Sequence, residues 1–456
     1  TVPHILASPG GVMARGGPVR LHLAAPITLS PSAGRATGRF ALHAGEQVNF
    51  QLTYAPADAE SGPADTDNAA TVEDTVAGWN SWAQLHDGYH GCHRAAVRRS
   101  SLVLQGLTYQ PTGAVVAAAT TSLPEKVGEE LNFDYRYAWL RDLSLTARAL
   151  WVAACPTEPG RMFDWFAQTA GQVGDGAVQI MYAVDGQRDL TEHTLEHLGG
   201  YRGSRPVRVG NDAWSQTQLD VYGEVLDAAH LLRDDLGPLD EPVQELLVAL
   251  ANRAATTWME PDAGMWEARD DKRHYLSSKV MCWVALDRAV RLAPRLGERA
   301  DPTLWAVAAD AVRAAILERG WSDTAGAYTG AFDSDHLDAS VLLMPLVGFV
   351  AATDERMLST IEAVERHLGS GGLVRRWPGD DSGFVICTFW LVECLALAAK
   401  AHRAEKWFAD ATGYAQRKRR VLAGYFEPPS QPRRAGPPAV GGCSVSSSTA
   451  CSRPPW

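Results

Sequence analysis

The sequence predicts an all-α protein in which paired helices form a closed double ring, an (α/α)-barrel. Eleven stretches with the apolar period of an amphipathic helix follow one another after about residue 85. Strand signals after residue 110 are scarce, and short connections alternate with long loops rich in Gly, Trp and Arg. A superhelical array of repeats is the alternative architecture, but no fixed sequence period supports it.

Residues 1 to about 55 precede the helices and have the pattern of β-strands. The stretches "VRLHLAAPITL" and "GRFALHAGEQVNFQLTY" contain many β-forming residues, with Gly, Pro and Ser between them. These are too few strands for a self-sufficient sandwich. Residues 56–78 are small, acidic and without period, which is typical of a linker. We therefore assign residues 1–78 to a partial β-sandwich and a linker.

The helices that follow have recognisable starts. Asp240 and Asp301 each precede a first turn that contains proline, as N-cap residues do. Because long connections between helices usually carry function, residues 172–212, 259–275 and 370–383 are expected together on one rim of the barrel. The expected helices begin near residues 89, 139, 159, 213, 240, 276, 302, 336, 355, 384 and 404.

The helical domain is assigned to residues 79–426. Beyond it, residues 427–456 are dominated by Pro, Gly, Ser and Arg and offer no apolar face, so we expect them to be disordered. The basic cluster at 417–420 has two interpretations, a localisation signal or the solvated end of a helix.

The composition excludes several classes of partner. The 456 residues carry a formal charge of −11, which disfavours nucleic acid and anionic membranes. No run of about 20 apolar residues is present and no signal peptide is visible, so the protein is expected in the cytoplasm. Seven cysteines without a CxxC pair predict free thiols rather than disulfides or a zinc site. Neither a metal nor a cofactor is expected.

Fifteen tryptophans have two interpretations. They fill a helical core, or several of them line a sugar site, because the C–H faces of sugars stack on aromatic rings. The stretch "NFDYRYAWLRD" (132–142) places Trp139 before Arg141 and Asp142. An acid at a helix N-terminus is stabilised by the helix dipole alone. Adjacent donors and acceptors, however, also suit two neighbouring hydroxyls of a pyranose.

A second polar stretch covers residues 201–224. It begins with three candidate binding residues, Tyr201, Arg202 and Arg208. It continues with Gln216, Asp220 and Glu224, whose spacing of four residues predicts that they share one helix face. A solvated helix face and a half-buried polar site both fit this pattern.

Two further stretches supply carboxylates. In "GMWEARD" (264–270), Glu267 lies between Trp266 and Arg269, and shielding by the indole would raise the pKa of Glu267, as a general acid requires. An exposed loop glutamate is the alternative. In "RRWPGDDSGFVICTFW", Asp380 and Asp381 precede an aromatic helix, where paired acids are commonly only N-caps.

Taken together, these stretches resemble glycoside hydrolase family 15, the glucoamylase and bacterial trehalase family. "TSLPEKVGEELNFDYRYAWLRDLSLT" is similar to its first active-site segment, and "QIMYAVDGQRDLTEHTLEHLGGYRGSRPVRVGNDAWSQTQLDVYGEVLDA" to the second. "GMWEARDDKRHYLSSKVMCWVALDRA" resembles the acid segment, and "DSDHLDASVLLMPLVGF" and "GFVICTFWLVECLAL" complete the set. The resemblance extends over about residues 80–420.

The resemblance implies a fold and a reaction. The family fold is an (α/α)6 barrel (a six-hairpin toroid) behind an N-terminal β-sandwich, and its members cleave α-linked glucose from non-reducing ends with inversion. Arg141 and Asp142 would hold glucose hydroxyls, and Glu267 would be the general acid. The other candidate substrate-binding residues are Trp139, Tyr201, Arg202, Arg208, Trp266 and Arg269.

The second carboxylate departs from the family pattern. The family usually has a glutamate three residues before the phenylalanine that opens the last motif, whereas this chain has Asp381, with Asp380 as a substitute. Inversion requires roughly 6.5–9.5 Å between the acid and the base. Because aspartate is one methylene shorter, reduced activity is expected, since a misplacement near 1 Å costs on the order of a hundredfold in rate.

Both ends of the chain also differ from the family pattern, with few strands before the barrel and eleven helices where twelve are expected. We therefore expect a barrel without its last helix behind a remnant of the sandwich. The leading hypothesis is an exo-acting inverting hydrolase of α-glucosides. The alternatives are an impaired relative that only binds α-glucosides, a barrel phosphorylase that uses the arginines at 202–208, and a non-enzymatic helical scaffold.

Overall fold

The computed structural model divides the chain into two compact units, Thr1–Trp82 and Ala83–Trp456. The tail at 427–456, which the sequence predicts to be disordered, lies outside the described residues. The structure describes residues 3–57 without 18 and 33, residues 72–153, 155, 157–170 and 178–426, with side chains up to residue 413.

The first unit contains a small antiparallel sheet, as the strand pattern predicts. The sheet has the order β1-β2-β3-β6, and a separate hairpin joins β4 to β5. Val12 on β2 is buried, whereas Leu52 and Tyr54 on β6 lie mostly exposed. The strands are β1 (His4–Ser8), β2 (Gly11–Gly16), β3 (Val19–Ala24), β4 (Ser30–Ser32), β5 (Arg35–Thr37) and β6 (Gln51–Pro56).

The expected linker contains an element that the sequence did not predict. Val72–Leu85 forms the helix α1, so the last part of the segment 56–78 is helical. Glu73 and Asp74 lie in its first turn, where the positive end of the helix dipole stabilises acids. Val72, Val76 and Trp79 repeat at helical spacing on α1 but lie exposed, and among its described residues α1 buries only Ala83.

The second unit consists of helices, and each of the expected stretches is helical in the described chain. Asp240 and Asp301 are N-caps as predicted, accepting from the amides of Val243 at 3.2 Å and Leu304 at 2.9 Å. The helices are α2 (Arg94–Leu107), α3 (Leu140–Val152), α4 (Thr157–Ala170), α5 (Asp220–Leu231), α6 (Glu241–Thr257), α7 (Leu276–Leu292), α8 (Pro302–Arg319), α9 (Leu343–Leu346), α10 (Glu355–Leu368), α11 (Val385–Leu397) and α12 (Ala401–Phe426).

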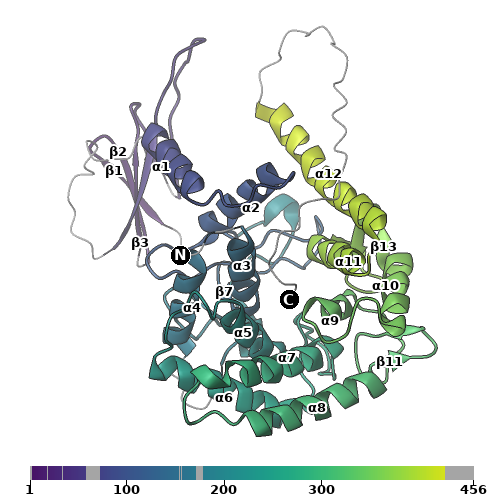
Figure 1. Ribbon diagram of the computed structural model, residues 1–456. Helices are drawn as coiled ribbons and strands as arrows, with labels where there is room; N and C mark the ends of the chain where they lie inside the picture. The colour runs from purple at the N-terminus through teal and green to yellow at the C-terminus, as the bar shows by residue number, and fades with distance from the viewer. Residues whose placement is uncertain are drawn as a thin grey trace. The chain divides into compact units, whose positions relative to one another are not determined.

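Figure 1 shows these helices in two layers. The inner layer contains α3, α5, α7, α9 and α11, and the outer layer contains α4, α6, α8, α10 and α12. Neighbouring inner helices pack directly, α3 against α5 and α5 against α7. The long loops at 172–212, 259–275 and 370–383 each precede an inner helix. Their functional side chains are therefore delivered to the N-terminal ends of the inner layer.

Three predicted helix starts are too early. α2 begins at Arg94 rather than near 89, and the 3-10 turn η4 (Ala339–Leu342) precedes α9 instead of a helix from 336. The third difference affects the polar face. A 3-10 turn, η2 (Asp212–Ser215), ends before Gln216, whose backbone is extended. Gln216 is therefore not on the helix, and Asp220 and Glu224 alone share the face of α5.

Short antiparallel strands brace the long loops. β7 (Ala138–Trp139) pairs with β8 (Met181–Tyr182), and β9 (His193–Thr194) pairs with β10 (Arg208–Val209). β11 (Trp321–Ser322) pairs with β12 (Ala327–Tyr328). β14 (Leu373–Arg375) lies between β13 (Gly369–Ser370) and β15 (Gly383–Phe384). Each pair fixes the entry to an inner helix, so the loops are held rather than free.

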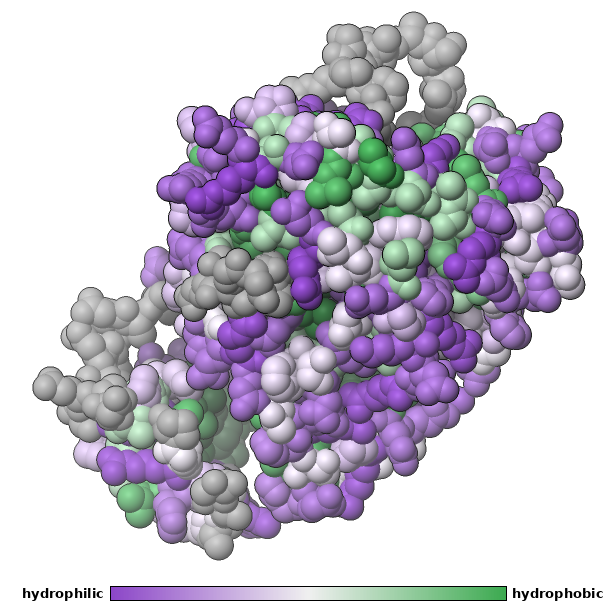
Figure 2. Space-filling model, turned by 90° about the horizontal axis from the view of Figure 1, so that it is seen from below, coloured by the Kyte–Doolittle hydropathy of each residue, from purple (hydrophilic) through white to green (hydrophobic). Residues whose placement is uncertain are grey.

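The exterior is polar, in keeping with the composition. Most of the face seen in Figure 2 is hydrophilic. Of the helices that the structure describes, none is long and apolar enough to cross a membrane. Of the cysteines that the structure describes, four are buried free thiols, whereas Cys92 is exposed. The buried four are Cys155, Cys282, Cys387 and Cys394.

The closest approach of two inner helices generates a stability prediction. A Cβ added at Gly223 of α5 would lie 2.2 Å from the carbonyl oxygen of Met281 on α7. Gly223→Ala should therefore lower the free energy of unfolding by about 1–3 kcal/mol through overpacking. Gly160 on α4 is the matched control, because nothing lies within 4 Å of its added Cβ. Gly160→Ala should be neutral or stabilising by about 0.5–1 kcal/mol. Urea unfolding of both variants measures the difference, and equal effects would contradict the tight helix contact.

Candidate active site

The first turns of α3 and α5 bring a buried arginine against a buried acid. Arg141 is 9% exposed and Asp220 is 1% exposed. Arg141 donates from Nη1 to Asp220 Oδ2 and to Gln218 Oε1, both at 3.0 Å. The ion pair is stabilised by these additional hydrogen bonds, which a buried charge requires. It fixes the guanidinium at the end of the inner layer.

Glu267 meets the same guanidinium from the other side. Its Oε1 accepts from Arg141 Nη2 at 3.1 Å and from the indole nitrogen of Trp139 at 2.6 Å. The side chain of Glu267 is 22% exposed, so one edge of the carboxyl faces open space. The structure therefore brings together three predicted site residues, from β7, α3 and the acid loop.

The backbone of the acid loop is built to hold Glu267. Glu267 has a φ of 60°, which is unfavourable for a residue other than glycine. The loop is closed by the bridge between Asp262 and Arg273, and Ala263 donates to the carbonyl of Thr217 at 3.0 Å. A Cβ at Gly264 would collide with the ring of Tyr275. The tight turn therefore presents Glu267 at the cost of backbone strain.

The environment acts on the Glu267 proton in two directions. Burial raises the pKa of Glu267, whereas the charge of Arg141 and the hydrogen bond from Trp139 lower it. Burial also raises the pKa of Asp142, which Arg141 opposes. No side-chain partner from the described residues contacts the Asp142 carboxyl, so its oxygens are available to a ligand. The site thus combines an acid of raised pKa with a free acceptor.

An aromatic wall lies beside Glu267. The ring of Tyr135 is 5.9 Å from that of Trp139, and burial together with Glu125 and Glu267 raises the pKa of Tyr135 to about 12. Trp266 does not bond Glu267. Its indole donates to Asp338 at 3.0 Å and packs against a group of aromatic rings. Those rings are Trp377, Phe384 and Trp390.

The candidate bases lie in the loop that this aromatic wall supports. Asp380 is 8% exposed and accepts from Arg376 Nε at 2.9 Å. The same arginine donates to Glu125 at 3.0 Å, and its charge helps to keep the pKa of Asp380 low. The side chain of Asp381 is 78% exposed, 3.2 Å from the amine of Lys126. The carboxylate of Asp380 is therefore already paired with Arg376, whereas that of Asp381 is held only by the exposed Lys126.

Arg208 and Arg269 both pack against the ring of Phe133. The guanidinium groups of Arg208 and Arg269 lie 4.9 Å and 4.6 Å from the centre of the Phe133 ring. Glu192 forms an ion pair with Arg208, 2.8 Å from its Nε, and accepts a hydrogen bond from Arg269 at 3.1 Å. Arg208 also donates to Asn132. These two predicted binding residues are thus committed to the wall around Phe133, with Arg269 the more exposed of the two.

The structure does not bring Tyr201 and Arg202 to the cluster. Both are exposed in the 3-10 turn η1 (Tyr201–Gly203), and Arg202 has a φ of 50°.

Sequence reasoning missed three residues that shape the site, Glu125, Gln218 and Asp338. Asp338 and Glu125 lie inside quoted motifs, but nothing in the pattern distinguishes them from surface acids. Gln218 also lies inside a quoted motif, two residues before Asp220, and again nothing in the pattern distinguishes it from a surface residue.

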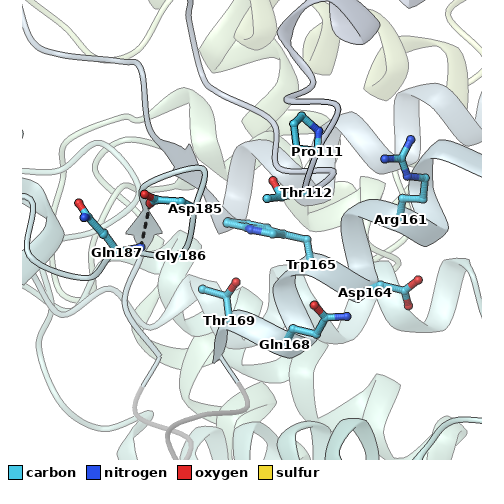
Figure 3. Close-up of a pocket in the computed structure, with 10 residues that line it drawn as sticks. All are labelled: Pro111, Thr112, Arg161, Asp164, Trp165, Gln168, Thr169, Asp185, Gly186 and Gln187. Atoms are coloured by element: carbon cyan, nitrogen blue, oxygen red, sulfur yellow. Dashed lines mark hydrogen bonds between the residues drawn. The ribbon is translucent and has the colours of Figure 1, made fainter. Parts of the chain in front are cut away.

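A cavity of about 670 Å³ lies apart from this cluster, between α4 and the turns at 111–112 and 185–187. Figure 3 shows the Trp165 ring lying across it, between Thr112 and Thr169. Trp165 is only 5% exposed, so it offers little of the ring face on which a sugar stacks. Within the described residues, no group of three His, Cys, Asp or Glu side chains is placed to hold a metal.

Comparisons with known proteins match the part of the chain that contains this site. The model of the family "Glycosyl hydrolases family 15" matches residues 91–416. The chain is 37% identical to the trehalase of Mycobacterium tuberculosis over 398 residues, which is 85% of this chain and 58% of that protein. It is 33% identical to the trehalase of Thermoplasma volcanium, covering 74% of this chain and 54% of that protein. The chain thus spans little more than half the length of these relatives.

Solved structures show the same fold. A bacterial glucoamylase complexed with acarbose matches with a TM-score of 0.66 at 13% identity, covering 90% of this chain and 69% of that chain. A wild-type glycosidase matches with a TM-score of 0.56 at 20% identity, over 72% of this chain and 83% of that chain. At such identities the likeness concerns the fold alone. With its helical fold, its small N-terminal sheet and the family match over most of its length, the chain belongs to glycosyl hydrolase family 15.

Proposed function

We propose that this protein hydrolyses α-glucosides from the non-reducing end with inversion, and that Glu267 is its general acid. The observation that carries the proposal is the placement of Glu267 between Trp139 and Arg141 on a strained turn. A carboxyl group that keeps a proton near neutral pH and faces open space is what protonation of a leaving oxygen requires.

The remaining side chains suit a glucose ring beside Glu267. Asp142 offers free carboxylate oxygens for hydroxyl groups, and the half-buried Tyr135 supplies apolar ring area, whereas Trp139 is only 2% exposed and acts as a donor to Glu267. The terminal nitrogens of Arg141 already bond to Gln218, Asp220 and Glu267. In this proposal the main role of Arg141 is therefore to orient Glu267, and contact with the sugar is its secondary role. We infer that the two layers of helices are the (α/α)6 barrel of the family.

Inversion proceeds in a single displacement, which needs a base opposite the acid. We assign this role to Asp381, because Asp380 is occupied by Arg376 whereas the exposed Asp381 is held only by Lys126. The loop of Asp381 is tied to the acid loop, since Trp266 contacts Trp377 and Phe384. Water would attack the anomeric carbon as the glycosidic bond breaks toward the oxygen protonated by Glu267, and Asp381 would take the water's proton.

Trehalose is the proposed substrate. The relatives that share 33–37% identity are named trehalase, and trehalose offers a terminal α-glucose to the same pocket as any other α-glucoside. A phosphorylase is less well supported. It would need free cations for phosphate, but Arg208 is committed to Glu192 and Asn132, and Arg202 lies exposed on η1.

The acid assignment predicts a loss of turnover without a loss of binding. Glu267→Gln should lower kcat on trehalose or 4-nitrophenyl α-glucoside by about 10²–10⁴-fold, because the transferable proton is removed. Glucose binding, measured by calorimetry, should persist. Asp270→Asn is the control, since Asp270 is an exposed acid of the same loop. Turnover near that of the wild type in the Glu267 variant would overturn the assignment.

The hydrogen bond from Trp139 predicts a pH shift. Because that bond stabilises the ionised form of Glu267, its loss in Trp139→Phe should raise the pKa of Glu267. The acid must be protonated to act, so the alkaline limb of kcat/KM should move to higher pH. A pH–rate profile of the variant against the wild type measures the shift. An unchanged or lowered alkaline limb would show that the titrating group is not Glu267.

The base assignment predicts opposite effects of two substitutions. Asp381→Asn should lower glucose release by about a hundredfold or more, and Asp381→Glu should raise it by restoring the family's side-chain length. Capping does not account for Asp381, because Phe384 is the N-cap of α11 and no side chain of the described residues caps that helix. Asp380→Asn is the comparison, because it removes the partner of Arg376 and leaves Asp381 in place. A fully active Asp381→Asn variant would assign the base to another carboxylate.

A further inference from the structure

Glu224 is a buried carboxyl group without a partner beneath the active-site arginine. It lies one turn after Asp220 on α5 and is 7% exposed. Among the described residues, no hydrogen bond or ion pair contacts its carboxyl group. A buried charge without a partner is costly, so such a group normally keeps its proton. The reaction proposed above does not use Glu224.

Two buried polar atoms that lack hydrogen-bond partners lie one turn before Glu224 on α5 and on the wall of the cavity that Glu224 also lines. Asp220 Oδ1 and the hydroxyl of Ser144 on α3 are buried without hydrogen-bond partners. Ser144 and Glu224 together line a cavity of about 30 Å³ between the inner helices. A cavity needs about 10–15 Å³ and two or more polar partners to hold a water molecule. The space therefore suits one or two waters.

The charges around Glu224 oppose its ionisation. Burial and the carboxylates of Asp220, Asp227 and Asp142 raise the pKa of Glu224 well above its ordinary value. Arg141 lowers that pKa, but its nitrogens are shared among Gln218, Asp220 and Glu267. On the remaining walls, Asp227 is paired with Arg288 of α7, and Arg148 of α3 acts on Glu393 of α11. From α7 and α9 the cavity is also lined by Met281 and Leu343, and Val347, which follows α9 directly, completes this wall.

We propose that Glu224 is a positioning residue for the active site, which carries its proton, donates it in a hydrogen bond to Asp220 Oδ1, and shares a buried water with Ser144. This arrangement satisfies the three unpartnered groups together. The proposal rests on the proposed function, because its effect on the reaction passes through Asp220 and Arg141 to Glu267. An ionised Glu224 would instead compete with Asp220 and Glu267 for Arg141.

The positioning role is tested with Glu224→Gln and Glu224→Leu in the full chain. The glutamine amide can donate to Asp220 and accept from the water, so this variant should keep kcat on trehalose within about threefold. The leucine leaves Asp220 Oδ1 unsatisfied and loosens Arg141, so kcat should fall by about 10–100-fold with little change in KM. Its alkaline limb should move to higher pH, because a loosened Arg141 lowers the pKa of Glu267 less. An inactive glutamine variant would show that an ionised Glu224 is required and would overturn the proposal.

The proton is tested without any activity. Because the pKa of Glu224 is raised in the fold, the wild type should lose stability as pH rises from the ordinary glutamate value toward the folded value. Glutamine does not titrate, so the Tm of Glu224→Gln minus that of the wild type should grow with pH. The control Glu241→Gln, at an exposed position on α6, should follow the wild type. A Tm difference for Glu224→Gln that is constant with pH would refute the protonated state. If the wild type hydrolyses no glucoside, the proposed function fails, while this measurement still decides the protonation of Glu224.

Discussion

The ion pair between Arg141 and Asp220 is the constraint on which the candidate site depends. It joins the first turns of α3 and α5 at 3.0 Å, and the second terminal nitrogen of Arg141 then reaches Glu267. Removing one partner of a buried pair leaves an uncompensated charge, which costs about 3–5 kcal/mol. Such a pair adds little net stability, but it fixes the positions of the two side chains. The ion pair therefore fixes α3 and α5 relative to each other at the point where the proposed reaction needs a fixed acid.

The layered fold explains why these side chains meet. In the described chain each inner helix begins after a long loop, and short strand pairs hold several of those loops in place. β7 is an example, because its pairing with β8 presents Trp139 directly before α3. The tight contact between α5 and α7 at Gly223 leaves no room for slippage in the layer that carries Asp220. The fold therefore determines the site through the starts of its inner helices.

The sequence predicted the helices well because their apolar period reflects burial against two layers. It failed where burial is slight, as in α1, and where a 3-10 turn delays a helix, as before α5. Glu267, Trp139 and Arg141 were identified through long motifs whose residues proved to be in contact. Tyr201 and Arg202 belong to an equally recognisable motif but lie exposed. A motif specifies which residues occur together, whereas only the fold decides which of them face the pocket.

The two carboxylates of the proposed reaction are held in very different ways. Glu267 is fixed by the indole of Trp139, the guanidinium of Arg141 and its own strained turn, at the N-terminal ends of the inner helices. On the rim, Arg376 holds the half-buried Glu125 and the buried Asp380, whereas the exposed Asp381 is held only by the exposed Lys126. Exposed ion pairs are weak because water screens them, so water or substrate can displace Lys126 from Asp381. A general acid must keep its proton and therefore needs burial, whereas a base must stay ionised and meet water. The division between a preorganised acid and a loosely held base follows from these opposite requirements.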